Sequence, residues 1–272
     1  MATIFQWPTD RTLVMGVLNI TPDSFSDGGK YTDVDSAVDQ ARAMAKAGAD
    51  IIDIGGESTR PGAEPVTSEK ELERVLPVIE RLSGFLVSVD TTKAGVAARA
   101  LAAGARIVND ISALGFDERM VEVVREHGAG VVLMHMQGTP QTMQRAPRYA
   151  DVGREVREFL EERIGFAVGR GVEKSQIAVD PGLGFGKTVE HNVQLLAQLG
   201  QLTTLGFPIV VGASRKSFIG KLLGRDEPQQ RLPGSLAAAA WAVAQGANVV
   251  RVHDVAETVD VIRMIEAVKL AK

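Results

Sequence analysis

Eight short apolar segments run along this chain, and each of them stops at polar residues or glycines. The segments are 13–18, 51–54, 85–89, 106–108, 130–134, 177–179, 209–211 and 248–250. The first ends in Asn19, the third in Asp90 and the sixth in Asp180. Glycine-containing sequences follow the second and the seventh segments. We expect eight buried strands, with side chains or backbone able to meet a ligand where each strand ends.

Helical patterns lie between these segments. Periodic apolar residues predict helices at 36–47, 68–82, 93–103, 118–127, 151–169, 189–199, 231–245 and 256–268. Asp35 is the expected N-cap of the first helix, and Ser68 with Glu71 forms the expected capping box of the second. Three glycines each separate a helix from the next strand and are expected in a left-handed conformation, namely Gly48, Gly104 and Gly246.

Eight strands alternating with helices predict an α/β fold, the closed (β/α)8 TIM barrel, whose chemistry lies on the loops after the strands. A doubly wound sheet is the alternative, and it would concentrate ligand residues at one switch point. Because polar residues follow every strand, the sequence favours the barrel. Residues 1–272 are expected to form one domain, since no linker, low-complexity tract or change of composition divides them.

Composition excludes several classes of function. The net charge is −4, and no dense run of Lys and Arg indicates a nucleic-acid partner. The chain has no cysteine, which removes disulfides, thiolate metal sites and a cysteine nucleophile. The longest apolar run, residues 236–244, is too short to span a bilayer, and the first residues do not resemble a secretion signal. We expect a cytoplasmic protein.

Acidic and amide side chains stand at successive strand ends. Asp90, Asp110 and Asp180 each end a strand or follow it directly, and Asn109 precedes Asp110. A carboxylate can accept two hydrogen bonds from the 2-amino-4-oxo-pyrimidine edge of a ligand, and asparagine can match a mixed donor and acceptor edge. Each of these residues could instead cap a helix. Three at successive strand ends favour a ligand site.

Cationic residues follow the last two strands. Arg251 and His253 alternate, so both can point to the same side, and Asn19 follows the neighbouring first strand around the closed ring. Such a group fits phosphate or pyrophosphate, whereas the alternative is a surface arginine and a histidine paired with Asp254. Lys216 follows the seventh strand and could donate to a ring atom or form a Schiff base, which the sequence alone does not separate.

Two segments resemble sites that the sequence does not support. Residues 182–188 resemble a phosphate-binding loop, but Pro181 stands where that motif requires glycine. The four histidines show no metal-ligand spacing, so we expect Met134 and Met136 beside His135 to form an apolar wall for a planar ring. A hard ion such as Mg²⁺, bound by an amide oxygen and substrate phosphates, stays open. Residues 21–30 and 55–63 form long polar loops that could cover an active site.

Two of these segments carry a specific resemblance. Residues 15–29 (MGVLNITPDSFSDGG) and 55–63 (GGESTRPGA) resemble the two signature segments of the dihydropteroate synthase family. The resemblance continues at 88–93 (SVDTTK), 108–110 (VND), 133–138 (LMHMQG), 179–187 (VDPGLGFGK), 212–217 (GASRKS) and 251–255 (RVHDV). It covers essentially the whole chain, with no departure at a motif position.

The resemblance implies a TIM-barrel transferase of folate synthesis. Such enzymes join 6-hydroxymethyl-7,8-dihydropterin pyrophosphate to p-aminobenzoate, release pyrophosphate and form 7,8-dihydropteroate, and sulfonamides compete for the p-aminobenzoate site. It also implies a homodimer, small-molecule substrates as the only other partners, and Mg²⁺ as cofactor. The implied mechanism is dissociative substitution, in which pyrophosphate leaves before the aryl amine attacks.

The resemblance also assigns site residues. Those implied for the pterin are Asp90, Asn109, Ile111, Met134, Asp180, Lys216 and Arg251. Those implied for pyrophosphate are Asn19, Arg251 and His253, with Asn19 also binding Mg²⁺. Those implied for p-aminobenzoate are Phe25, Thr59, Arg60, Pro61, Phe185 and Ser217. The implied catalytic set is Asn19, Asp27, Lys216, Arg251 and His253, with Asp27 facing the cationic intermediate.

Two other functions compete with this one. A pterin-binding paralogue would keep the barrel and lose catalysis, but Asn19, Asp27, Thr59 and Arg60 argue against it. A methyltetrahydrofolate methyltransferase would use a similar pterin pocket together with a corrinoid partner. It would not need the sequence of residues 57–61.

Overall fold

The strands form one parallel sheet that closes on itself. The computed structural model describes residues 3–20, 30–60 and 62–271. The strands are β1 (Leu13–Asn19), β2 (Ile51–Gly55), β3 (Val87–Asp90), β4 (Ile107–Asp110), β5 (Gly130–Met134), β6 (Ile177–Asp180), β7 (Val210–Val211) and β8 (Val249–Val252). Their order is β6-β5-β4-β3-β2-β1-β8-β7, and a parallel bridge between Val179 and Ile209 joins the two edges. The predicted TIM barrel is confirmed, and a doubly wound sheet is excluded.

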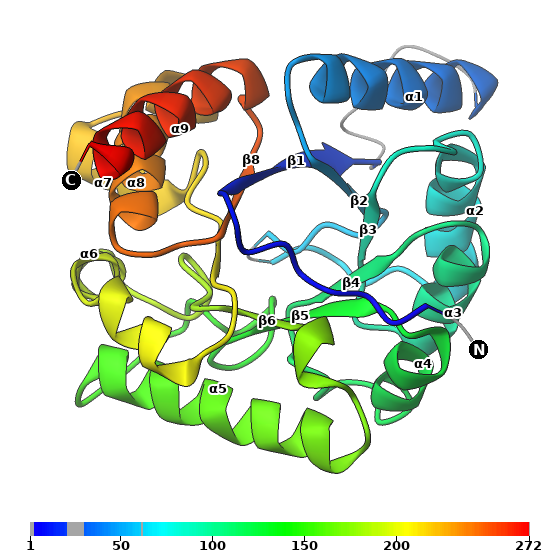
Figure 1. Ribbon diagram of the computed structural model, residues 1–272, viewed down its shortest axis with the longest axis horizontal. Helices are drawn as coiled ribbons and strands as arrows, with labels where there is room; N and C mark the ends of the chain where they lie inside the picture. The colour runs from blue at the N-terminus through cyan, green and yellow to red at the C-terminus, as the bar shows by residue number, and fades with distance from the viewer. Residues whose placement is uncertain (1–2, 21–29, 61, 272) are drawn as a thin grey trace.

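Helices surround the barrel, as Figure 1 shows. They are α1 (Lys30–Lys46), α2 (Ser68–Ile79), α3 (Ala94–Ala102), α4 (Met120–His127), α5 (Val152–Gly169), α6 (Val189–Ala197), α7 (Ser217–Leu223), α8 (Leu232–Ala244) and α9 (Val255–Leu270). Within the described residues, no helix is long and apolar enough to cross a membrane. Short 3-10 turns, η2 (Lys174–Gln176), η3 (Leu199–Leu205) and η4 (Pro228–Arg231), complete the connections.

Two predicted helix starts were wrong. Helix α1 begins at Lys30, so Asp35 lies inside the helix and is not its N-cap. The N-cap of α2 is Thr67, whose hydroxyl accepts a hydrogen bond from the Lys70 amide, so Ser68 is the first helical residue. Glu71 does not reach back to that cap, because its side chain is fully buried against Lys93. Helix α7 was not predicted.

The predicted left-handed conformation of three glycines is confirmed. Gly48, Gly104 and Gly246 have φ values of 105°, 121° and 102°. A backbone of this kind is unfavourable for residues with a Cβ atom, so glycine is the residue that ends these helices and returns the chain to the sheet.

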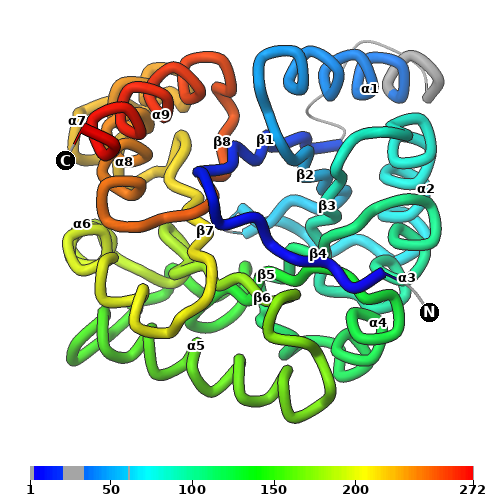
Figure 2. Tube along the Cα trace, viewed as in Figure 1, coloured from blue at the N-terminus to red at the C-terminus, as the bar shows by residue number. Residues whose placement is uncertain are grey.

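The N-terminal segment closes one end of the barrel. In Figures 1 and 2 it crosses the barrel end that faces the viewer. The Phe5 amide donates to the Gly128 carbonyl at 2.8 Å, and the Trp7 indole nitrogen donates to the Gln176 carbonyl at 2.8 Å. Phe5 and Trp7 pack with Met15, Ile107 and the other inward-facing residues of the strands. The opposite end, at the carboxyl ends of the strands, carries the polar side chains.

Candidate active site

One pocket lies at the carboxyl ends of the strands. Its lining comes from seven of the eight strands or the loops that follow them: Thr59, Asp90, Asn109, Ile111, Met134, Asp180, Gly182, Leu183, Phe185, Gly212, Lys216 and Arg251. The structure therefore brings together all seven residues that the sequence assigned to a pterin, with Thr59 and Phe185 from the p-aminobenzoate set. In a parallel barrel the strand ends point to the same mouth, which explains why residues so far apart in the sequence meet here.

The acids of the pocket are buried. Asp180 ends β6, and its Oδ1 accepts a hydrogen bond from the Gly182 amide at 2.7 Å. Burial raises the pKa of the Asp180 carboxyl above its usual value, although this hydrogen bond opposes the shift. Burial also raises the pKa of Asp90 to about 7, against the opposing effect of the Arg251 guanidinium. Such strongly shifted carboxyls in a cleft are typical of functional sites.

Arg251 connects the two sides of the pocket floor. Its Nε donates to Asp53 Oδ2 at 2.6 Å, and its terminal nitrogen donates to Asp90 Oδ2 at 2.7 Å. Asn109 Nδ2 also donates to Asp53 Oδ2, at 3.0 Å. Burial alone would lower the pKa of Arg251. The nearby Asp53 and Asp90 outweigh burial and raise this pKa above its usual value. The guanidinium is therefore a fixed positive charge in the lining of the pocket.

Sequence reasoning missed Asp53. This residue lies inside β2 and is fully buried, and among the described residues its Oδ1 has no hydrogen-bond partner. The other candidate residues stand where apolar runs end, whereas Asp53 interrupts such a run between Ile52 and Ile54. A charged residue inside a buried strand needs a partner. That interruption was the signal that could have identified it.

Asn19 and His253 lie beside the pocket and do not line it. Asn19 pairs with Gly55 in the β1–β2 register. A Cβ atom at Gly55 would lie 3.6 Å from Asn19 Oδ1 and 3.8 Å from Asp90 Oδ2, so the Asn19 amide oxygen is directed toward the Asp90 side of the mouth. Ser214 Oγ lies 3.1 Å from His253 Nδ1, a contact that the sequence did not predict.

Burial favours the neutral form of the His253 imidazole. Burial lowers the pKa of His253 to about 3, and the neighbouring Arg251 lowers it further in the same direction. The alternative pairing of His253 with Asp254 was wrong, because the Asp254 carboxylate binds the guanidinium of Arg215 at 2.5 and 3.0 Å. We therefore interpret His253 as a neutral hydrogen-bonding group and Arg251 as the cation of this pair.

Lys216 faces the aromatic wall of the pocket. Its Nζ lies 4.1 Å from the ring centroid of Phe185, a distance typical of a cation–π contact. Burial lowers the pKa of Lys216 to about 8, and Arg251 acts in the same direction. The amine is thus mostly protonated at neutral pH and begins to lose its charge just above it.

The apolar wall consists of residues from the end of β5 and from several loops. Ile111, Met134, Met143 and Phe185 form one buried cluster, with Met136 packed against it. The expectation that the methionines line an apolar wall agrees with this cluster. The remaining p-aminobenzoate candidates lie farther out, since Arg60 and Ser217 are exposed. Phe25, Asp27 and Pro61 lie outside the described residues.

Asp110 has a structural role instead of a role in the pocket. One of its oxygens accepts from the Ser112 amide and hydroxyl at 2.8 and 2.7 Å, and the other accepts from the Leu114 amide at 2.8 Å. Its ligand interpretation was wrong, because these three donors occupy the carboxylate in the loop after β4. Asp110 is also not the helix cap that was the alternative, because α4 begins at Met120 with Arg119 as its N-cap.

Lys187, the lysine of the phosphate-loop resemblance, is also structural. Its Nζ donates to the carbonyls of Gly182 and Phe185 at 2.9 and 3.0 Å, and it lies 2.9 Å from His135 Nδ1. The rejection of a phosphate loop agrees with this geometry, since the amine faces the interior of its own loop. Among the described residues, no group of three His, Asp or Glu side chains could hold a metal ion.

The fold and the pocket identify a class of protein. The sequence matches the family described as "Pterin binding enzyme" over residues 15–253. The chain belongs to this family of pterin-binding enzymes.

Its relatives in that family are more specific. The dihydropteroate synthase of Synechocystis sp. is 49% identical over 268 residues, covering 97% of this chain and 92% of the relative. A solved structure of Xanthomonas albilineans dihydropteroate synthase with 4-aminobenzoic acid has a TM-score of 0.90 at 50% identity and covers 96% of this chain and 94% of that chain. The same enzyme in complex with 7,8-dihydropteroate has a TM-score of 0.88 at 47% identity and covers 97% of this chain and 95% of that chain.

Proposed function

We propose that this chain catalyses the dihydropteroate synthase reaction, joining 6-hydroxymethyl-7,8-dihydropterin pyrophosphate to p-aminobenzoate in folate synthesis. The observation that carries the proposal is the single pocket that gathers Asp90, Asn109, Asp180, Lys216 and Arg251 at one barrel mouth. The relative from Synechocystis sp., which is named for this activity, is 49% identical over nearly the whole chain. Residues 1–272 act as one domain, because the pocket draws on loops from much of the chain.

The pterin binds between the acids and the apolar wall. Asp180 accepts two donors from the pyrimidine edge, and Asn109 matches a mixed donor and acceptor edge. Asp90 supports the same edge, and its charge is balanced by Arg251 at 2.7 Å. Lys216 donates to a ring oxygen or nitrogen. The groups that lie against the ring are Ile111, Met134 and Arg251.

Pyrophosphate binds beside the pterin, at Asn19, Arg251 and His253. Arg251 contributes the charge, and His253 contributes a hydrogen bond because its pKa is about 3. Asn19 offers an amide oxygen, a hard donor of the kind that Mg²⁺ binds, and the other ligands would be pyrophosphate oxygens and water. When bound, Mg²⁺ would stabilise the negative charge of the leaving group.

The p-aminobenzoate pocket lies toward the outer side of the pterin. Thr59 and Phe185 line the cleft. Arg60 and Ser217 are exposed, and they would contact the substrate where it meets solvent. Phe25 and Pro61 complete this set.

The reaction proceeds by dissociative substitution. The bond between the exocyclic methylene carbon and the pyrophosphate oxygen breaks, and the electron pair leaves with pyrophosphate. The aryl amine nitrogen then attacks the cationic methylene-pterin, and a proton leaves the new C–N centre. Asp27 is the carboxylate assigned to face this cation. Lys216 stays non-covalent, because the pterin substrate carries no free aldehyde or ketone that could form an imine.

One assay tests the proposal. Pure protein is mixed with the pterin pyrophosphate, p-aminobenzoate and Mg²⁺, and dihydropteroate is measured. Formation of dihydropteroate is expected. Pterin binding without product would instead indicate a catalytically inactive paralogue, and methyl transfer from methyltetrahydrofolate to a corrinoid protein would indicate a methyltransferase.

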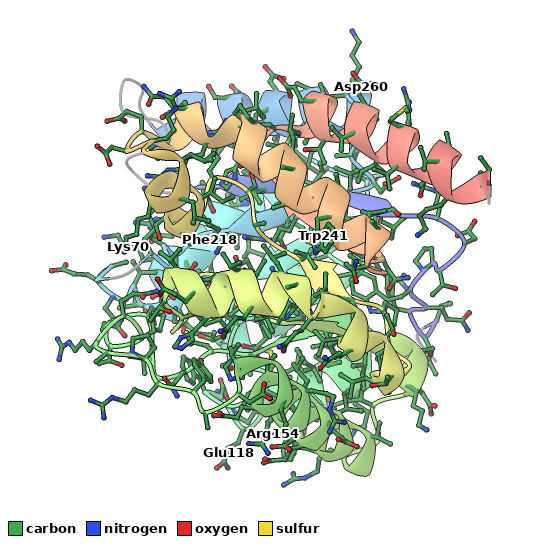
Figure 3. The ribbon with its side chains drawn as sticks, turned by 90° about the vertical axis from the view of Figure 1, so that its left-hand side faces the viewer. Lys70, Glu118, Arg154, Phe218, Trp241 and Asp260 are labelled. Carbon is green, nitrogen blue, oxygen red and sulfur yellow. The ribbon has the colours of Figure 1, made fainter. Side chains whose placement is uncertain are left out.

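Two further expectations belong to this proposal. The chain forms a homodimer through an apolar groove of about 320 Å³, lined by Val193, Leu196, Ala197, Phe218, Ile219, Leu222, Leu223, Gly234, Ala238 and Trp241. Figure 3 views this side of the molecule, with Phe218 and Trp241 labelled. A large apolar patch on a surface is typical of a protein interface.

The cytoplasmic location stays a prediction, which fractionation of cells would test.

A further inference from the structure

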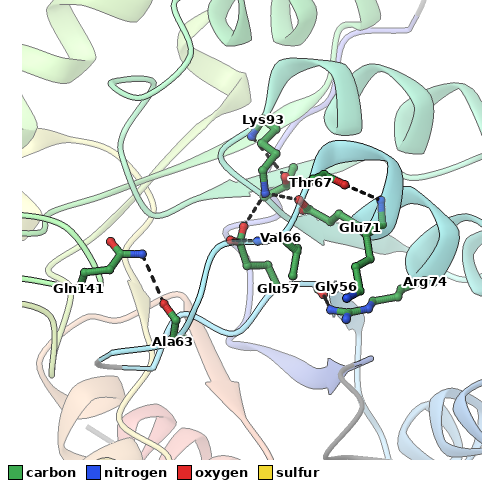
Figure 4. A network of polar contacts seen from close by, with 11 residues as sticks. Gly56, Glu57, Ala63, Val66, Thr67, Glu71, Arg74, Lys93 and Gln141 are labelled. Carbon is green, nitrogen blue, oxygen red and sulfur yellow. Dashed lines mark hydrogen bonds and ion pairs between the residues drawn. The ribbon is translucent and has the colours of Figure 1, made fainter.

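A lysine and two glutamates form a cluster beside the pocket, at the base of the loop that follows β2. Lys93 Nζ lies 2.5 Å from Glu57 Oε2 and 2.6 Å from Glu71 Oε2. Figure 4 shows how the three side chains converge from different elements. Glu57 belongs to the loop, Glu71 to α2, and Lys93 is the residue before α3. None of the three lines the pocket.

The cluster holds both ends of the loop. Glu57 Oε2 binds Lys93, while Glu57 Oε1 accepts a hydrogen bond from the Val66 amide at 3.0 Å. One side chain thereby fixes the start of the loop, its end and the neighbouring β3–α3 turn. Thr59 and Arg60 lie between the two anchored ends.

The base of this loop is tightly packed. A Cβ atom at Gly56 would lie 2.9 Å from Val75 Cγ1 and 3.1 Å from the Glu71 carbonyl, so α2 leaves no space for a side chain there. Arg74 donates to the Gly56 carbonyl at 2.5 Å. The loop therefore leaves β2 along one path, and a change in the cluster is passed directly to the residues that follow Glu57.

The charges of the cluster depend on one another. Glu71 is fully buried, and among the described residues its Oε1 has no hydrogen-bond partner, so Lys93 is its compensating cation. Burial lowers the pKa of Lys93, but the contacts with Glu57 and Glu71 outweigh it and raise the pKa above its usual value. Lys93 therefore stays charged. Removing it would leave a buried carboxylate unpaired.

Lys93 also lies close to the pterin side of the pocket. It follows Asp90 by three residues, and its amide donates to Thr91 Oγ1 at 3.2 Å, within the turn that carries Asp90. Lys93 thus connects the turn that follows Asp90, through its backbone, to the loop of Thr59 and Arg60, through its side chain.

We propose that Lys93 and Glu57 are positioning residues that hold the Thr59–Arg60 loop against the pterin side of the pocket and so set the affinity for p-aminobenzoate. The inference rests on the proposed function. Neither residue touches a substrate, and both act through the loop between Glu57 and Val66. Misplacement of a substrate-contacting loop by about 1 Å is sufficient to reduce turnover strongly.

The test compares Glu57→Gln with Glu64→Gln. The glutamine at 57 keeps the shape and can still accept from the Val66 amide, but its neutral amide no longer pairs with Lys93. Glu64 is exposed on the same loop, and Glu64→Gln removes the same charge. We expect Glu57→Gln to raise the KM for p-aminobenzoate about tenfold while the Kd for the pterin, measured alone by calorimetry, changes less than about twofold. Glu64→Gln should leave both unchanged.

A second pair of variants addresses folding. Lys93→Met leaves the buried Glu71 carboxylate without a cation and can unfold the protein. Lys93→Met combined with Glu71→Leu removes both charges together. We expect the double variant to fold and to show the same rise in KM, and Lys93→Arg to restore most of the affinity. Equal KM values in the unsubstituted protein, Glu57→Gln and the double variant would overturn the inference. An unsubstituted protein that forms no dihydropteroate would overturn the proposed function and this inference with it.

Discussion

The carboxylates of the pocket floor differ in how their charges are balanced. Arg251 lies between Asp53 at 2.6 Å and Asp90 at 2.7 Å, so one cation serves two buried carboxylates. Asp180 has no such direct partner and accepts from a backbone amide instead. It is therefore the carboxylate with most capacity left for a ligand that offers two donors.

The first residue-scale prediction concerns Asp180 and Asp90. Substituting asparagine for either should weaken pterin binding by roughly 1.5–3 kcal/mol, the cost of losing a charged hydrogen-bond acceptor. The fold should persist, because an asparagine oxygen can still accept from the Gly182 amide at 180 or from Arg251 at 90. Calorimetry with the pterin measures the loss. Asp35→Asn, on an exposed helix position, is the control, and unchanged affinity in both pocket variants would remove these residues from the site.

The second residue-scale prediction concerns the pH dependence of pterin binding. The pKa of Lys216 is lowered to about 8, so its amine is positive below that pH and loses the charge as the pH rises through it. If this charge helps to bind the pterin, affinity should fall between about pH 7.5 and 9. Lys216→Arg stays protonated over this range and should lack that fall while keeping some turnover. Identical alkaline profiles for the two proteins would contradict a charged donor at this position.

Part of the site could be predicted from single residues and part could not. Asp90, Asn109 and Asp180 were found because they end apolar segments, and a barrel brings strand ends together. Asp53, Ser214 and the cluster of Lys93 with Glu57 and Glu71 were missed. Their roles depend on which side chains meet across elements, and sequence periodicity carries no information about such pairings.

At the scale of elements, an ion pair between two elements explains why one helix start was predicted wrongly. The helix after β2 was expected to begin with a capping box at Ser68, because Ser and Glu three residues apart is the usual pattern. The structure instead uses Thr67, since Glu71 is committed to Lys93. A tertiary ion pair thus decided a local structure that the sequence pattern alone would have assigned differently.

This correction gives an element-scale prediction. Thr67→Ala should lower the free energy of unfolding by about 0.5–2 kcal/mol, because the Lys70 amide loses its capping acceptor. Ser68→Ala, at the first helical position, should change it by less than about 0.5 kcal/mol. Urea denaturation of the two variants measures the difference. A larger loss for Ser68→Ala than for Thr67→Ala would restore the cap at Ser68.

At the scale of the whole molecule, the barrel has one closed end, one functional end and one apolar side. The N-terminal segment closes the first, and the pocket occupies the second. The apolar side, formed by α6, α7 and α8, has a groove that shares no lining residue with the pocket, and it exposes Leu222, Leu223 and Trp241. The sequence did not identify this surface, because α7 was not predicted and only the fold brings these three helices together.

The proposed homodimer gives the prediction at this scale. Leu223→Asp places a charge in the apolar groove, where an interface would have to bury it unpaired, so the protein should become monomeric. Phe116→Asp is the matched control, because both side chains are 50% exposed and Phe116 lies in the loop after β4, away from the groove. Sedimentation at micromolar concentration should show a dimer for the unsubstituted protein and for Phe116→Asp, and a monomer for Leu223→Asp. Because the groove and the pocket share no residues, monomeric Leu223→Asp should still bind the pterin. A monomeric unsubstituted protein, or a dimer that survives Leu223→Asp, would contradict the assignment of this surface.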